Sequence, residues 1–140
     1  MNQCIINFGS FNWLSVFVAA IAGFALGALW YSPIMFSKAW VKLQDLKEDD
    51  LKKGWMTAMI VTFITTLLTA FVLEAVIATW HLTFWGHAFP ISILFGLFLY
   101  GGNQLSDFLY SRRPMKLFWI VAMYRFVMIL VMSIILILWQ

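Results

Sequence analysis

The sequence predicts an all-α membrane protein with four transmembrane helices and a cytoplasmic, interfacial amphipathic helix between the first and the second. Three observations lead to this fold class. Hydrophobic residues make up 64% of the 140 residues and charged residues only 11%, and the mean hydropathy is +0.91. The apolar residues gather in four runs, each long enough to cross a bilayer. The basic residues fall almost entirely in two of the loops between these runs.

The four apolar runs set the predicted helices and leave no room for a separate soluble domain. They cover residues 13–31, 55–80, 88–110 and 117–139. At 1.5 Å per residue, each run crosses about 30 Å of hydrocarbon. Residues 1–140 are therefore expected to form a single domain. Residues Met1–Asn12 contain no Lys or Arg, so they lack the charged start of a cleavable signal peptide and the first run is expected to stay as a helix.

The distribution of positive charge predicts how the chain crosses the membrane. Eight of the nine Lys and Arg residues lie in the first and third loops, and none lies in the second loop or at either end. Because cytoplasmic loops carry an excess of Lys and Arg, these two loops are expected in the cytoplasm and both termini outside it. A net charge of +3 that is divided between two short loops favours anionic lipid headgroups as the partner, and not nucleic acid.

The first loop contains a short amphipathic segment, Ile34–Leu46. A helical projection places its apolar residues largely on one side and Lys38 and Lys42 on the other, and Pro33 suits the first turn of such a helix. Two roles remain open. The helix lies in the headgroup layer, where its lysines bind anionic lipid, or it packs beneath the bundle. The acidic residues Glu48–Asp50 follow and would suit the N-terminus of the second span.

Small residues predict the packing face of the first span. They recur at four-residue intervals: Ser15, Ala19, Gly23 and Gly27. Because lipid provides no hydrophobic driving force between helices, close approach along such a ridge is what holds membrane helices together. The ridge either packs within the chain or forms the seam of a homodimer.

A second ladder of small and polar residues predicts that Glu74 faces protein. The members of the ladder are four residues apart along the second span: Ala58, Thr62, Thr66, Ala70, Glu74 and Ala78. Each step advances about 400° around the helix, so the ladder drifts and favours a tilted crossing. A carboxylate on this ladder is expected to point away from lipid.

The third span carries a polar face. At about 100° per residue, five residues fall within roughly a quarter of the helical circumference: Gly96, Tyr100, Asn103, Asp107 and Tyr110. The adjacent pair Gly101–Gly102 weakens the helix, and it marks either a packing notch or a discontinuous helix of the kind found in transporters.

Arg125 is the only basic residue inside a span. Its backbone lies about 12 Å from the start of the fourth span, and Asp107 lies near the end of the third. A short loop joins these two spans. We therefore expect an ion pair between Arg125 and Asp107, assisted by Asn103 or Gln104, which either clamps the two helices together or forms part of a polar route.

The remaining candidates for chemistry are weaker. Glu74 with His81 and His87 could bind a metal or relay protons, or Glu74 could be a buried carboxyl bonded to Thr or Trp. No tight ligand spacing is present, so we expect no metal and no cofactor. There is no phosphate-binding glycine loop and no catalytic motif, so we expect no enzymatic activity. The single cysteine, Cys4, excludes an intrachain disulfide.

Several short strings are distinctive beyond their hydropathy: Trp30-Tyr31-Ser32-Pro33 with Phe36 and Trp40, then Asp107–Tyr110, Arg113-Pro114, Leu117-Phe118 and Tyr124-Arg125. Over nearly the whole chain they resemble an uncharacterised bacterial membrane-protein family filed as domain of unknown function 1761. The resemblance implies a compact four-helix bacterial membrane protein, which we expect in the cytoplasmic (inner) membrane. It brings no activity and no catalytic residues.

Two functions are compatible with these features. The favoured one is an interaction, assembly or accessory protein that forms a homodimer or another homo-oligomer in the membrane. The alternative is a small-solute or proton-linked transporter or channel in which intramembrane polar side chains line a pathway: Glu74, Asn103, Asp107 and Arg125.

Overall fold

The structure, a computed structural model, describes residues 8–140, and Cys4 lies outside the described residues. Four helical segments are long and apolar enough to cross a membrane: Trp13–Trp30, Trp55–Thr79, Trp85–Tyr110 and Met115–Leu138. Residues 8–140 contain no strand. The predicted all-α class with four membrane-spanning helices is therefore confirmed. The helix ends differ little from the predicted runs, and the largest difference is the start of the third span at Trp85 instead of residue 88.

The described elements, in chain order, are η1 (Phe8–Ser10), α1 (Trp13–Trp30), α2 (Ser37–Gln44), α3 (Glu48–Lys52), α4 (Trp55–Thr79), η2 (Trp85–His87), α5 (Ala88–Ile91), η3 (Ser92–Gly101), α6 (Gly102–Tyr110) and α7 (Met115–Leu138). The third span is built from η2, α5, η3 and α6. Helix α7 contacts α1, α4 and the third span, so it is the centre of the bundle.

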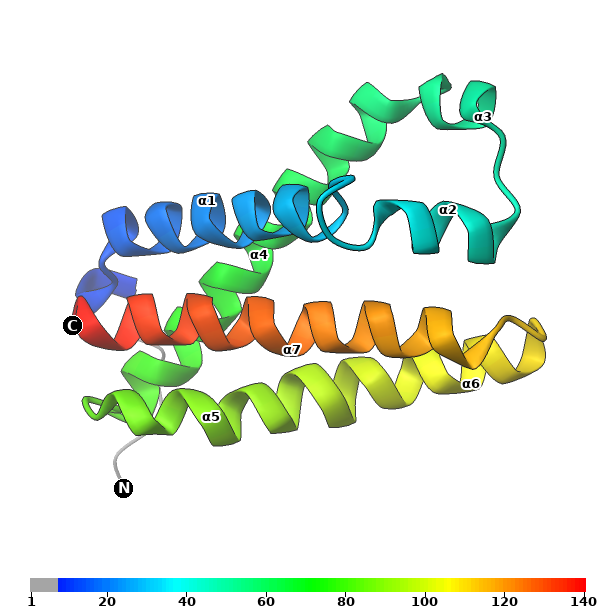
Figure 1. Ribbon diagram of the computed structural model, residues 1–140. Coiled ribbons are helices and arrows are strands. Elements are labelled where there is room, and N and C mark those ends of the chain that lie inside the picture. The colour runs from blue at the N-terminus through cyan, green and yellow to red at the C-terminus, as the bar shows by residue number, and fades with distance from the viewer. Residues whose placement is uncertain (1–7) are drawn as a thin grey trace.

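Figure 1 shows α1, α7 and the third span running side by side, with α4 crossing them obliquely. The start of α1 and the end of α7 lie at one end of the bundle, here called the terminal end. Helices α2 and α3 and the turn between α6 and α7 lie at the opposite end, here called the basic end because eight Lys and Arg residues lie in or directly beside these segments. The N-terminal half of α4 diverges from the other helices toward the basic end.

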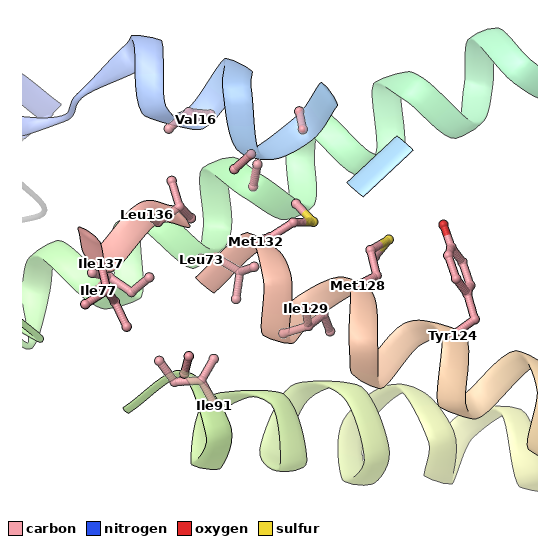
Figure 2. Packing of buried hydrophobic residues seen from close by; sticks show 14 residues of the cluster. Val16, Leu73, Ile77, Ile91, Tyr124, Met128, Ile129, Met132, Leu136 and Ile137 are labelled. Atoms are coloured by element: carbon pink, nitrogen blue, oxygen red, sulfur yellow. The ribbon is translucent and has the colours of Figure 1, made fainter. Parts of the chain in front are cut away.

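The core follows α7 along its length (Figure 2). Met128, Met132 and Leu136 succeed one another on the face of α7 that is turned toward α1 and α4, and each is no more than 1% exposed. Leu73 and Ile77 meet them from α4. Unbranched methionine side chains adapt to irregular gaps between helices, which suits a helix that must pack against three neighbours at once.

The small-residue ridge of α1 lies inside the bundle. Ser15, Ala19 and Gly23 are buried. A Cβ atom added at Gly23 would lie 2.7 Å from Met132 Sδ, and one added at Gly27 would lie 2.6 Å from the Tyr124 hydroxyl. The ridge therefore packs against α7 within the chain, and it is not available as the seam of a homodimer.

The third span differs from its prediction. Its backbone is helical through Gly101 and Gly102, so the helix is not broken there. The packing notch is instead at Gly96, where an added Cβ would lie 3.0 Å from Phe126 Cα. Residues Ser92–Gly101 form a π-helix. Because a π-helix bonds i to i+5, it advances less than 100° per residue, so the residues beyond it do not keep the predicted face.

The first loop also differs from its prediction. Helix α2 begins at Ser37, after a turn that contains Pro33, and ends at Gln44, where the following residue, Asp45, has a left-handed φ of 52°. The acidic run starts a separate short helix, α3, and Gly54, with φ of 69°, joins α3 to α4. The acidic residues therefore do not cap the second span directly. The left-handed backbone at Gly54 favours glycine at this corner.

The intrachain packing of the ridge leads to a test with a matched pair of glycines. Gly27→Leu should destabilise the protein by about 1–3 kcal/mol or more, because the new side chain displaces Tyr124. Gly102→Leu should be neutral or stabilising, because nothing lies within 4 Å of its added Cβ and leucine favours the helix. Thermal unfolding of both variants in the same detergent measures the difference. Equal stability of the two variants would contradict the packing of α1 on α7.

Candidate functional site

A cavity of about 700 Å³ is lined by residues of α1, α2, α4 and α7 and, toward the basic end, by residues of α3. It occupies the wedge that α4 leaves when it diverges from the bundle. Phe24, Val41 and Met59 contribute apolar wall, and Arg125 contributes a charged side chain from α7. Lys53 and Asp50 line it near the basic end. We call this space the arginine cavity.

Arg125 is held by aromatic rings and not by a carboxylate. Its guanidinium carbon lies 4.5 Å from the ring centroid of Tyr100 and 5.3 Å from that of Tyr124. Its Nε is buried and has no hydrogen-bond partner among the described residues. Cation–π contacts of this kind are favourable, but they leave the charge of the guanidinium uncompensated.

Tyr31, from the string Trp30-Tyr31-Ser32-Pro33, lines the cavity, and Trp30 fixes the end of α1 beside it. Trp30 Nε1 donates to the carbonyl oxygen of Ile120 on α7 at 3.2 Å. The ring centroid of Tyr31 lies 5.2 Å from that of Tyr124 and 5.8 Å from that of Trp40. These contacts tie the end of α1 to both α7 and α2. The absence of a side chain at Gly27 leaves room for the Tyr124 hydroxyl.

Asp107 does not pair with Arg125, so the predicted ion pair is wrong. Its carboxylate lies 4.0 Å from Arg113, and both side chains are about half exposed, at 58% and 50%. The reason is the winding of the third span, because the π-helical segment turns the following residues. Phe108 is the residue of α6 that is buried, and Asp107 faces away from α7. An exposed pair of this length contributes little stability.

The two amides that were expected to assist the pair have other partners. Asn103 is exposed, and its Nδ2 donates to the carbonyl oxygen of Leu99 at 2.9 Å. Gln104 Nε2 lies 3.4 Å from the Tyr100 hydroxyl. Gln104 thus supports the ring beneath Arg125, whereas Asn103 does not contribute to the cavity.

Glu74 lies at the other end of the bundle, fully buried. Both of its carboxylate oxygens accept hydrogen bonds from Gln140 Nε2 at 3.1 Å, and the backbone N–H of Asn12 lies 3.5 Å from one of them. The predicted inward orientation is confirmed, but the partners are an amide and a backbone N–H instead of Thr or Trp. Asn12 also caps α1, since its Oδ1 accepts from the N–H of Ser15 at 3.2 Å.

The histidines do not join Glu74. His81 follows the end of α4 with a left-handed backbone, φ 50°, and the ring of His87 lies against Phe84, 5.7 Å between centroids. No group of three His, Cys, Asp or Glu side chains within residues 8–140 is arranged to hold a metal ion.

Helix α2 combines features of both roles considered for it. Trp40 and Leu43 pack against a small cluster formed by α6 and α7, which contains Phe108 and Phe118. Lys38 and Lys42 are exposed. The apolar side of α2 is therefore covered by the bundle, and its lysines remain free to meet other molecules at the basic end.

The fold and the comparisons together define the class of protein. Four apolar helices around a packed core make this chain a multi-pass membrane protein. The family model described as "Protein of unknown function (DUF1761)" matches residues 14–137, and the chain belongs to this family. Neither a curated protein nor a solved structure matches the chain.

The tyrosines are the part of the site that the sequence analysis did not identify as functional. Tyr31, Tyr100 and Tyr124 converge around Arg125 from three different helical segments. Two of them lie in the strings that carried the family resemblance, next to Trp30 and Arg125 respectively. Their position beside those residues could have identified them from the sequence, because an amphipathic ring next to an intramembrane cation is a suitable partner for that cation.

The contacts of Glu74 allow a prediction about the terminal end. Gln140→Ala removes both 3.1 Å bonds and leaves the buried carboxyl with the long contact to Asn12. The expected loss is about 1–3 kcal/mol of unfolding free energy. Gln104→Ala is the matched control, because it removes an amide with one 3.4 Å contact. Chemical unfolding in one detergent compares the two, and a control variant that is as unstable as Gln140→Ala would contradict this assignment.

Proposed function

We propose that this protein is a non-enzymatic interaction or assembly protein of the bacterial inner membrane that works by associating with other copies of itself. In this proposal the basic end faces the cytoplasm and both termini lie on the outer side. The grouping of eight Lys and Arg residues at one end supports this orientation by the positive-inside rule. Exposed Lys38 and Lys42 on α2 are then in place to contact anionic headgroups.

The observation that carries the proposal is the exposure of the N-terminal half of α4. Every residue from Trp55 to Thr62 is exposed, although this segment belongs to a membrane-spanning helix. One side of it lines the arginine cavity. Beside the cavity-lining side, small or β-branched residues follow at four-residue intervals: Thr57, Val61 and Thr65. We call these three residues the threonine stripe.

The threonine stripe has the composition of a helix contact in lipid. Short side chains allow helices to approach closely, and hydroxyl groups add hydrogen bonds. Thr65 Oγ1 already donates to the carbonyl oxygen of Thr62 at 2.9 Å, so it remains an acceptor for a partner. The neighbouring exposed side chains Met56 and Ile60 are large and apolar, which suits contact with acyl chains.

The placement of the ionisable groups favours association over conduction. Glu74 is sealed at the terminal end, Asp107 is exposed at the basic end, and Arg125 lies in the cavity. Between Glu74 and Arg125 the bundle is filled by Leu73, Met128 and Met132. A pathway for a small solute or a proton would need a continuous row of polar groups through this section, where the buried polar side chains are Thr66 and Ser133.

Cross-linking tests the stripe. In a Cys4→Ser background, Val61→Cys should form a disulfide-linked dimer in membranes under mild oxidation, because a symmetric contact places the two copies of this residue face to face. Ile60→Cys is the matched control at the same depth, on the large apolar side. Electrophoresis without reductant measures the fraction of dimer. Equal cross-linking at both positions, or none at either, would refute self-association through the stripe.

A further inference from the structure

We propose that the arginine cavity binds an anionic phospholipid, with its phosphate on Arg125 and an acyl chain along the apolar wall. This inference goes beyond self-association, because it concerns the inner side of α4 and not the threonine stripe. The chemistry of the lining indicates the class of ligand, which is a phosphate ester with an attached hydrocarbon chain.

The first argument is the unpaired charge. Within residues 8–140, Arg125 has no ion pair and no hydrogen bond, and its guanidinium rests on the rings of Tyr100 and Tyr124. A cation inside a membrane protein is unfavourable unless an anion or hydrogen-bond acceptors meet it. Guanidinium binds phosphate through paired, charge-assisted hydrogen bonds. The cavity beside it is the space from which such an anion can approach.

The second argument is the shape of the cavity. Its volume of about 700 Å³ is in the range of sites that hold small organic ligands. Ala58, Met59 and Thr62 line it from α4, and all three are exposed. The cavity is therefore open along α4, where the surroundings of a spanning helix are acyl chains.

The third argument is the order of polar and apolar lining. Lys53 and Asp50 line the part near the basic end, and the carboxylate of Asp50 already accepts from the N–H of Lys47 at 3.3 Å. Phe24 and Met59 are apolar wall. A soluble phosphate would lose its hydration against these side chains, whereas a lipid covers them with its own chain. Basic pockets between transmembrane helices are known to hold anionic headgroups.

The experiment is native mass spectrometry of the full-length protein in a neutral detergent, with phosphatidylglycerol, phosphatidylcholine and inorganic phosphate as separate probes. We expect one phosphatidylglycerol per chain to be retained at concentrations where phosphatidylcholine, whose phosphate is balanced by choline, is lost. Arg125→Gln should weaken the retention by about tenfold or more, the loss expected for a charge-assisted hydrogen bond.

A second variant tests the same site without touching the cation. Ala58→Trp places a large ring in the open side of the cavity from an exposed position, so it should fold and should also weaken retention about tenfold. Ile60→Trp adds the same ring on the far side of α4, and Lys116→Gln removes a cation of α7 that is exposed and outside the cavity. Both controls should bind as the unaltered protein does.

Three outcomes would overturn the proposal. Equal retention by all variants would place the lipid elsewhere on the surface. Inorganic phosphate that binds without lipid and displaces it would make the ligand a soluble anion. An Ala58→Trp protein that loses its self-association but keeps its lipid would show that a second copy fills the cavity. Because the cross-linking at Val61 is measured separately, failure of the lipid site is distinguishable from failure of self-association.

Discussion

A charged side chain inside hydrocarbon must find its partners within reach, because no water is present there to solvate it. This constraint separates the two ionisable side chains that lie deep in the bundle. Glu74 is matched within the chain, by Gln140 and the backbone of Asn12. Arg125 meets only aromatic rings among the described residues. The terminal end is thus closed by internal hydrogen bonds, whereas the basic half of the bundle holds a cation that forms no ion pair within residues 8–140.

The same half of the bundle is open for a reason of packing. Ala19 and Ala70 are fully buried, so α1 and α4 approach closely toward the terminal end. Gly23 continues this contact beside Thr66. Two straight helices that touch at one level and cross at an angle move apart with increasing distance from the point of contact. Residues Trp55–Thr62 of α4 are therefore exposed, and the segment with α2 and α3 connects this diverging end of α4 to α1.

Hydropathy, charge and residue spacing were sufficient for the spans, for the grouping of basic residues at one end and for the inward orientation of Glu74. They failed where the result depended on rotation about a helix axis. Helical rise places Asp107 within reach of the long Arg125 side chain, but helical rise does not determine the direction in which either side chain points. The cavity was also beyond prediction, since it arises from the divergence of α4. The position at which two helices cross cannot be predicted from short-range patterns in the sequence.

The absence of the predicted Arg125–Asp107 ion pair and the unpaired charge of Arg125 have the same cause. Had the third span kept ordinary α-helical winding, Asp107 would share a face with Gly96, which packs on the backbone of Phe126, and it would reach toward Arg125. The π-helical segment Ser92–Gly101 instead leaves Tyr100 under the guanidinium and turns Asp107 toward Arg113. π-helical turns occur often at functional sites, and departures from local rules tend to mark such sites. The winding of this span therefore accounts both for the absence of the Arg125–Asp107 pair and for the aromatic surroundings of the guanidinium.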